Sequence, residues 1–477
     1  MEQLIYSIND LIWSNALIIL CLGAGIYFSV VTRFLQVRYF KEMIKLLFSG
    51  KSSAQGVSSF QAFALALSGR IGTGNIAGVA TAIAMGGPGS LFWMWVIAFL
   101  GASSAYVEAT LGQIFKEVKD GQYRGGPAYY IEKGLGIKWY AMIFALVTIL
   151  STSFFLPGVQ SNSIALSVKN AFDFPVEYTG GIVCLFLGLI ILGGIKRIGK
   201  VAEIVIPFMA FGYIIIALII IGLNFSEIPA VFSLIVKSAF NLESTYSGVF
   251  GMAIAWGIKR GIYSNEAGQG TAPHAAAAAE ASHPAKQGLV QAFSVYIDTL
   301  FVCSATGFMI LFTQKFNVVN PNGGFIVENL PGVSIGPEYT QFAISEYFPN
   351  FGPAFVAIAL IFFSFTTIMA YYYIAETNLS YLQKDGKQKW PTYALRGLIL
   401  AATYFGTVRT AELAWTLGDI GVGLMAWLNV IAILLLRKPA LEALKDFKAQ
   451  KDAGKDPTYD FEAMKENYSK NKKVLIK

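Results

Sequence analysis

Residues 68–78 read SGRIGTGNIAG and lie inside an otherwise apolar run from Phe60 to Met85. Glycines stand at positions 69, 72, 74 and 78 of this stretch, and each glycine in a helix costs about 1 kcal/mol relative to alanine. We therefore expect the helix to be interrupted near residues 69–74. Backbone groups freed at membrane depth are tolerated only where they line a cavity or are bonded elsewhere. The alternative is a glycine-rich face against which another helix packs closely.

The composition is that of a membrane protein. Of the 477 residues, 55% are hydrophobic and only 14% are charged, against about 25% in soluble domains. Apolar runs of about 18 residues recur, and each can cross a hydrocarbon core about 30 Å thick. The sequence therefore predicts an all-α, multi-pass protein of the cell inner (plasma) membrane. The net charge is +7, but eleven of the 36 Lys and Arg residues follow Leu436. We expect this basic tail to face lipid headgroups rather than nucleic acid, and no obligate protein partner is evident.

Hydropathy predicts eleven membrane helices, at about residues 14–33, 57–84, 90–114, 139–168, 179–195, 201–222, 246–267, 287–313, 351–380, 391–407 and 411–436. Successive connections between these helices alternate between the two sides of the membrane. The connections on one side, together with the tail, hold 31 Lys and Arg residues, and those on the other side hold four. By the positive-inside rule, the N-terminus lies outside and the C-terminus in the cytoplasm.

The expected helices divide into an extra helix and two sets of five. Because each set has an odd number of helices, the second set enters the membrane from the opposite side, which permits an inverted repeat. In both sets the first helix, the second and seventh of the chain, is rich in glycine, and such interrupted helices in two halves point to a transporter's binding site. The expected organisation is an extra helix with its cytoplasmic connection, a first repeat, a second repeat and a basic cytoplasmic tail, at residues 1–56, 57–245, 246–436 and 437–477.

An interrupted helix can bind both an ion and a carboxylate. The carbonyls that end its first half suit a cation, and the free N–H groups that begin its second half suit a carboxylate. Asn75 stands at this second start and can cap it or ligate an ion. The seventh expected helix also carries many glycines, and we place its break near Trp256 and Gly257.

Polar side chains in two later helices are further candidates. Thr366 and Thr367 could complete an oxygen shell for a small cation, although membrane threonines more often bond to their own helix. Asp298 is expected near the midplane, where an acid costs several kcal/mol and is a functional candidate by default. We favour a structural pairing of Asp298 with a cation, and the candidates are Arg70, Lys259 and Arg260.

Three long motifs resemble the alanine or glycine:cation symporter family. They are GGPGSLFWMWVIAFLG at 86–101, GGPAYY at 125–130 and KRGIYSNEAGQGTAPHAAAAA at 259–279. The resemblance runs from about residue 10 to 436. It implies a leucine-transporter-type fold, a 5+5 inverted repeat preceded by one extra helix.

The resemblance also implies site residues. It implies a Na⁺ site formed by the carbonyls of Ser68, Ile71 and Phe363 and the hydroxyls of Thr366 and Thr367. It implies a substrate site at Gly72, Thr73, Gly74, Asn75, Gln160, Trp256, Gly257 and Tyr371. Relatives commonly have Gly and Trp where this chain has Ala370 and Tyr371. If these two positions face the pocket, its volume and polarity differ in this chain, and alanine is a less secure substrate.

The leading hypothesis is a secondary active transporter that imports a small neutral amino acid of the alanine and glycine class, coupled to Na⁺ by alternating access. The alternatives are a proton-coupled amino acid permease, in which Asp298, Glu266 or Glu108 titrates, and a glutamine-preferring member of the same family. An ion channel lacks a ring-forming signature. We expect no enzyme, because no catalytic dyad with suitable spacing occurs in the spans.

Overall fold

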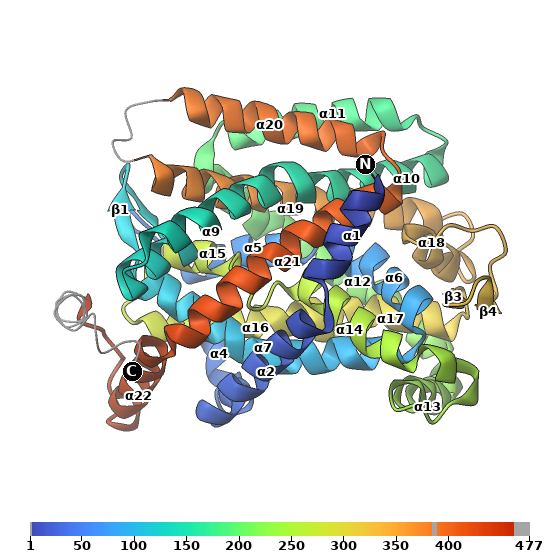
Figure 1. Ribbon diagram of the computed structural model, residues 1–477, viewed down its shortest axis with the longest axis horizontal. Helices are drawn as coiled ribbons and strands as arrows, with labels where there is room; N and C mark the ends of the chain where they lie inside the picture. The colour runs from blue at the N-terminus through green and yellow to red at the C-terminus, as the bar shows by residue number, and fades with distance from the viewer. Residues whose placement is uncertain (1, 384–388, 462–477) are drawn as a thin grey trace.

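The computed structural model describes residues 2–383 and 389–461 (Figure 1). Helices dominate this part of the chain, and short π or 3₁₀ turns, labelled η, interrupt or join them. Two antiparallel hairpins lie in connections, and they are β1 (Glu117–Lys119) with β2 (Gln122–Arg124), and β3 (Asn317–Val319) with β4 (Phe325–Glu328). The N-terminal helices are α1 (Glu2–Ile12), α2 (Asn15–Val31), α3 (Leu35–Arg38) and α4 (Phe40–Leu47).

The segment expected to form the first repeat continues the chain with α5 (Ser59–Arg70), η1 (Gly74–Gly78), α6 (Val79–Gly86), α7 (Gly89–Ile114), α8 (Pro127–Tyr130), η2 (Ile131–Leu135), α9 (Lys138–Leu150), η3 (Ser151–Phe155), α10 (Leu156–Phe172), α11 (Val176–Ile191), α12 (Gly194–Leu223), η4 (Phe225–Glu227) and α13 (Ile228–Ala239). The rest of the chain forms η5 (Ser244–Val249), α14 (Phe250–Asn265), α15 (Ala272–Ala278), α16 (Pro284–Tyr296), η6 (Ile297–Cys303), α17 (Ser304–Phe312), α18 (Pro337–Ser345), α19 (Gly352–Leu382), α20 (Trp390–Thr407), α21 (Ala411–Leu435) and α22 (Arg437–Asp452).

Each of the eleven ranges expected from hydropathy contains a helix. Among the described residues, seven helices are long and apolar enough to cross a membrane on their own, and an eighth span results if η4–α13 and η5–α14, bent by 45°, are counted as one. The second half of the second expected helix, Gly74–Gly86, and α11 are shorter apolar helices. The multi-pass membrane architecture is therefore confirmed, and the number of crossings and the repeat layout stay predictions.

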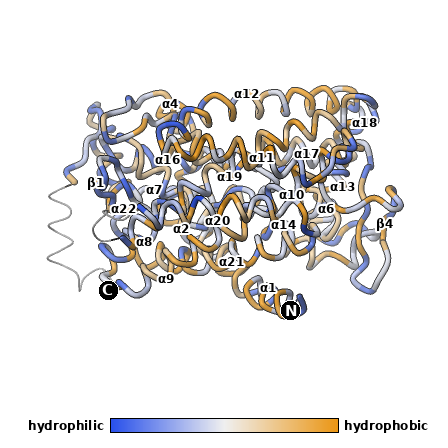
Figure 2. The backbone as a smooth tube through the Cα atoms, turned by 90° about the horizontal axis from the view of Figure 1, so that it is seen from above, coloured by the Kyte–Doolittle hydropathy of each residue, from blue (hydrophilic) through white to orange (hydrophobic). Residues whose placement is uncertain are grey.

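Connections expected on opposite sides of the membrane lie at opposite ends of the molecule. Helix α4, the β1–β2 hairpin and α22 gather at one end of the long axis, and α13, α18 and the β3–β4 hairpin gather at the other (Figure 1). Hydrophilic residues are concentrated at these two ends, and apolar helices lie between them (Figure 2). This distribution agrees with the alternation of connections that the sequence predicts.

The residues before the first expected helix are helical as well. Residues 2–12 form α1, whose apolar side chains recur at helical spacing, and α1 and α2 together make one apolar stretch of 30 residues. Trp427 donates to the carbonyl of Ile12 at 3.0 Å, and α1 packs on α21. The extra helix is thus a bent pair whose first arm contacts the last expected span.

The second expected helix starts at a capping box and stops at the predicted break. The Ser58 hydroxyl accepts from the Gln61 amide at 3.1 Å, and the Gln61 side chain accepts from the Ser58 amide at 3.1 Å. These bonds satisfy two of the free N–H groups at the start of α5. Helix α5 ends at Arg70, and the chain resumes as the π turn η1 at Gly74. The interruption predicted near residues 69–74 is confirmed.

Candidate functional site

The break between α5 and η1 supplies free backbone groups in a buried place. Ile71 has extended backbone with φ −75° and ψ 97°, so the helical hydrogen-bond pattern stops there. The Gly72 amide, which would continue the helix, is instead bonded to the Asn75 side-chain oxygen at 2.9 Å. Gly72 is required by crowding, because a Cβ there would lie 2.5 Å from the Thr367 hydroxyl and 2.8 Å from the Gln160 side-chain oxygen.

Oxygen atoms from two helices converge at Thr367. Its hydroxyl lies 2.8 Å from the Ser68 carbonyl, 3.1 Å from the Ile71 carbonyl and 2.9 Å from the Phe363 carbonyl. All of these groups are buried. Carbonyl and hydroxyl oxygens are the donors that small hard cations prefer. The described residues contain no group of three or more His, Cys, Asp or Glu side chains that could hold a metal. Because its donors are carbonyl and hydroxyl oxygens, the cluster at Thr367 is the candidate cation site.

Thr366 is less closely joined to this cluster. Its hydroxyl bonds to the Phe362 and Phe363 carbonyls of its own helix, both at 2.9 Å, which is the usual behaviour of a membrane threonine. The structure thus brings Ser68, Ile71, Phe363 and Thr367 together as the family resemblance implies. Thr366 shares only the Phe363 carbonyl with them.

The other side of the break presents amides. The Thr73 amide donates to Gln160 of α10 at 3.0 Å, and the Thr73 hydroxyl lies 2.8 Å from the Ser364 hydroxyl. Gly74 packs against α14, since a Cβ there would lie 3.2 Å from the Ser264 Cα. Tyr371 is buried on α19 one turn after Thr367 and so lies on the same face of that helix. These contacts join four of the eight predicted substrate residues, Gly72, Thr73, Asn75 and Gln160, and Gly74 lies between two of them in the chain.

The seventh expected helix is broken, but not where we predicted. Helix α14 continues through Trp256 and Gly257 to Asn265. The break follows at Glu266, Gly268 and Gly270, which have φ values of 54°, 81° and 89°, and α15 starts at Ala272. The predicted position was wrong because glycine is selected both by close helix packing and by a left-handed backbone, and the sequence does not distinguish the two.

Trp256 and Gly257 have roles of their own in α14. A Cβ on Gly257 would lie 2.5 Å from the Ser90 carbonyl, so this glycine permits close packing on α7. Trp256 lies beside two cations, with the Lys259 ammonium 4.9 Å and the Arg260 guanidinium carbon 5.1 Å from the centre of a Trp256 ring. Neither residue lies at the break.

A buried carboxylate holds the second break open. Glu108 of α7 accepts from the Gly268 amide at 3.3 Å, from the Gly270 amide at 3.1 Å and from the Asn429 side chain at 2.7 Å. Glu266 accepts from the Thr271 hydroxyl at 2.7 Å. The two carboxylates thus bind the backbone and side chain that the break frees. From the sequence, both were only candidates for a titrating group.

Asp298 does not pair with a cation, which corrects our prediction. Its carboxylate accepts from Asn75 at 2.6 Å, from Ser264 at 3.0 and 3.1 Å, and from Thr299 at 2.8 Å. No Lys, Arg or His nitrogen of the described residues lies within ion-pair distance of it. Asp298 lies in the π turn η6, and π turns are frequent at functional sites. The carboxylate instead joins the two broken helices through Asn75 and Ser264.

Three cations that we expected near Asp298 or in a connection have other partners. Lys259 and Arg260 lie inside α14, and both bond to Asp419 of α21 at 2.8 Å. They are two of the 31 cations that we counted on one side, so the charge bias persists without them. Asp419 was not identified from the sequence, although an acid inside an apolar run was a visible signal. Arg70 donates to the Gln291 carbonyl at 3.1 Å and to the Ser294 hydroxyl.

Comparisons with known proteins agree with the motifs. The sequence pattern of the sodium:alanine symporter family matches residues 1–461. A candidate sodium/proton-dependent alanine carrier protein of Bacillus subtilis (strain 168) is 63% identical over 97% of this chain and 96% of its own. A sodium/proton-dependent alanine carrier protein of Bacillus sp. (strain PS3) is 55% identical over 88% and 94%, respectively. A candidate sodium/glutamine symporter of Bacillus subtilis (strain 168) is 43% identical over 98% and 94%. The chain belongs to the sodium:alanine symporter family.

Proposed function

We propose that the protein imports a small neutral amino acid, alanine in preference to glutamine, together with Na⁺ by alternating access. The observation that carries this proposal is the convergence of three backbone carbonyls on the Thr367 hydroxyl beside the break of the second expected helix. The two alanine carriers are also more similar to this chain than the glutamine symporter is.

The proposed Na⁺ site uses the carbonyls of Ser68, Ile71 and Phe363 and the Thr367 hydroxyl. Without the ion, the three carbonyls share the single hydroxyl hydrogen of Thr367. A bound Na⁺ would be coordinated by all four oxygens. Thr366 would join only by turning its hydroxyl away from its own helix.

The proposed substrate site lies at the amides on the other side of the break. The Thr73 amide donates to the Gln160 side-chain oxygen, and the Gly72 amide donates to that of Asn75. A substrate carboxylate would replace one of these two acceptors. A bound substrate therefore leaves no buried amide unpaired. The crowding around Gly72 and Gly74 favours a short side chain such as the methyl group of alanine.

One co-transported cation supplies enough free energy for import. Moving one charge through about 100 mV yields about 2.3 kcal/mol, which supports about 40-fold accumulation before any ion gradient is added. We further propose that the protein lies in the plasma membrane, with its N-terminus outside and its C-terminus in the cytoplasm. We propose also that residues 57–245 and 246–436 are the two inverted repeats.

A second candidate function is coupling to protons. It is favoured by Asp298, a fully buried carboxylate that hydroxyl and amide groups hold without a cation in the described residues. Such a carboxylate can bind a proton without leaving a cation unpaired. The alanine carriers named above are described as sodium/proton-dependent.

The test is uptake of labelled alanine, glycine and glutamine into proteoliposomes, with inward Na⁺ or with choline at matched pH. Accumulation of alanine that requires Na⁺ is the expected result. Uptake that ignores Na⁺ but follows an inward proton gradient would refute the role of the Thr367 site and favour Asp298. A greater rate with glutamine would refute the substrate assignment alone.

A further inference from the structure

A basic pocket lies where the first span ends, between α2 and α3 on one side and α22 on the other. The cavity measures about 500 Å³. Four cations line it, together with the aliphatic side chains of Val31, Leu441 and Leu444, and these cations are Arg33, Arg38, Lys445 and Lys448. We call this cavity the basic pocket.

The positive charge in the basic pocket is largely uncompensated. Asp452 is its only acidic lining residue among those described, and it lies 3.8 Å from Lys448. Arg38 donates to the Thr32 carbonyl at 3.3 Å. Within the described ranges, the side chains of Arg33 and Lys445 have no ion-pair partner. Four cations against one carboxylate make a site for an anion.

The backbone is strained where it presents the first of these cations. Arg33 and Phe34 have φ values of 55° and 53°, so two consecutive residues other than glycine are left-handed. Such conformations cost of order 1–3 kcal/mol each and persist only where the surroundings impose them. The turn ends α2 and leads directly into α3, which carries Arg38. The strained turn therefore brings the two arginines to one pocket.

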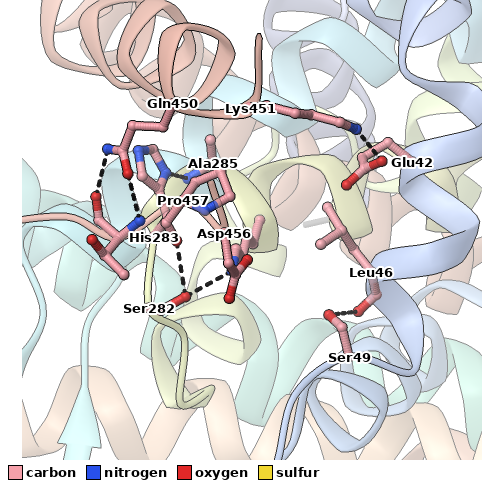
Figure 3. Close-up of polar contacts among 12 residues, drawn as sticks. Glu42, Leu46, Ser49, Ser282, His283, Ala285, Gln450, Lys451, Asp456 and Pro457 are labelled. Atoms are coloured by element: carbon pink, nitrogen blue, oxygen red, sulfur yellow. Dashed lines mark hydrogen bonds and ion pairs between the residues drawn. The ribbon is translucent and has the colours of Figure 1, made fainter. Parts of the chain in front are cut away.

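Polar contacts with other parts of the chain hold α22 in place (Figure 3). Lys451 pairs with Glu42 of α4, and the Asp446 carboxylate lies 3.1 Å from His283. The segment after α22 continues this attachment, because Asp456 pairs with Lys286 at 2.6 Å. None of these partners lines the basic pocket. They fix the orientation of α22 and leave Lys445 and Lys448 directed at the pocket.

An apolar groove adjoins the basic pocket, and Arg38 lines both. The groove measures about 690 Å³, and its apolar walls are Val37, Phe40, Phe99, Leu300 and Phe301. Phe301 is 48% exposed, so this wall faces the surroundings of the protein. A site for an anion that continues into an apolar groove is complementary to an amphiphile, a molecule with an anionic headgroup and an apolar chain.

We propose that the basic pocket and its groove bind one anionic phospholipid of the cytoplasmic leaflet. The phosphodiester lies among Arg33, Arg38, Lys445 and Lys448, and an acyl chain lies along Phe40 and Phe301. Basic pockets between membrane helices on the cytoplasmic side bind such headgroups. A soluble phosphate ester would use the same cations, but it would leave the groove empty. The inference requires only the membrane orientation proposed above and is independent of the coupling ion.

The site has a route to the transport machinery. Leu300 and Phe301 belong to η6, the same π turn that carries Asp298. An acyl chain against these side chains would support the turn that holds the carboxylate between the two broken helices. We therefore expect the bound lipid to raise the rate of uptake as well as the thermal stability.

The experiment compares matched variants in nanodiscs of phosphatidylcholine with or without phosphatidylglycerol. The test variant is Arg33→Gln/Lys445→Gln, whose side chains have no ion-pair partner in the described structure. The control variant is Lys196→Gln/Lys200→Gln, which removes the same charge from exposed residues of another connection expected in the cytoplasm. Native mass spectrometry counts the retained phosphatidylglycerol, and thermal unfolding measures its stabilising effect.

We expect the wild type and the control variant to retain phosphatidylglycerol preferentially and to gain stability from it. The test variant should bind it about 30-fold more weakly, since each cation near the membrane surface contributes about fivefold. An equal loss in both variants would overturn the proposal, because it would show general attraction to cytoplasmic cations. Retention unchanged in the test variant would also overturn it. Equal stabilisation by glycerol phosphate in pure phosphatidylcholine would refute a lipid as the occupant.

Discussion

Replacing Thr367 by Val tests the proposed Na⁺ site most directly. Valine has nearly the same shape, so the change removes a hydroxyl and leaves the packing of α19 in place. The hydroxyl lies within 3.1 Å of the Ser68 and Ile71 carbonyls, and no side chain of the described residues other than Thr367 donates to these two groups. The substitution therefore removes one of the proposed oxygen ligands and, when no ion is bound, the hydroxyl hydrogen that these two buried carbonyls share.

The magnitude follows from these contacts. A polar contact with a charged partner contributes about 1.5–3 kcal/mol, so the Na⁺ concentration for half-maximal alanine uptake should rise about 10- to 150-fold. An unpaired buried carbonyl costs about 1–3 kcal/mol, so in choline the variant should also unfold at a lower temperature than the wild type does. Initial rates in proteoliposomes across a Na⁺ series, with thermal unfolding in each salt, measure both effects.

The control is Thr403→Val in α20. Thr403 is equally buried, and its hydroxyl bonds only to the Ile399 carbonyl of its own helix at 2.7 Å. It should leave the Na⁺ dependence unchanged. Thr366→Val should have a smaller effect than Thr367→Val, because Thr366 bonds to its own helix. An unchanged Na⁺ dependence in Thr367→Val, or an equal change in Thr403→Val, would refute the site.

Three other changes test neighbouring parts of the molecule. Gly72→Ala places a Cβ 2.5 Å from the Thr367 hydroxyl, so alanine uptake should fall strongly while the amount of inserted protein, measured by immunoblot, stays the same; normal uptake would contradict the proposed crowding. Asp298→Asn should lower alanine uptake about tenfold by disturbing the contacts with Asn75 and Ser264, and initial rates over a pH series should lose their pH dependence if protons are coupled there. Burial lowers the pKa of His283 to about 4, and its neutral ring accepts from the Ala285 amide. This stabilisation is complete above about pH 6.5 and is lost as the pH falls towards 4, so proteolysis after α22 should accelerate over that window, and equal rates would contradict it.

The positions of the helices could be predicted because they depend on the length and polarity of local runs. A hydrocarbon core requires about 20 apolar residues, and this requirement is visible in the sequence. Helix α1 was missed because it is not such a continuous apolar run. Its apolar residues recur at helical spacing among polar ones, so an average over the window conceals them.

The two broken helices show what glycine does and does not reveal. At residues 69–74 the glycines lie at the break, and the prediction was confirmed. In the seventh expected helix, Gly257 allows α7 to approach, whereas Gly268 and Gly270 adopt positive φ. Close approach and a left-handed backbone both select glycine. Only the path of the chain distinguishes them, so the break could be predicted to exist but not located.

The buried ion pairs could not be assigned from depth alone. The sequence places several acids and cations within spans, and any pairing among them balances charge. The structure pairs Lys259 and Arg260 with Asp419, because α14 and α21 bring those side chains together. Asp298 is then surrounded by groups that donate hydrogen bonds but carry no charge. The pairing depends on which helices lie next to each other, and hydropathy does not reveal helix neighbours.

Asn75 gives a physical reason to expect that the two candidate ion sites act together. Its side-chain oxygen accepts from the Gly72 amide at 2.9 Å, while its side-chain nitrogen donates to Asp298 at 2.6 Å. The amide group can serve both partners only in this orientation, because Gly72 requires an oxygen and a carboxylate requires an N–H group. If a proton or a cation occupied Asp298, its carboxyl group would attract the Asn75 nitrogen less strongly, and the Asn75 side chain could turn more easily. A turn of this side chain would withdraw its oxygen from the Gly72 amide, which could then meet a substrate carboxylate next to the carbonyls that face Thr367. A change of charge at Asp298 thus reaches the proposed substrate site through a single side chain.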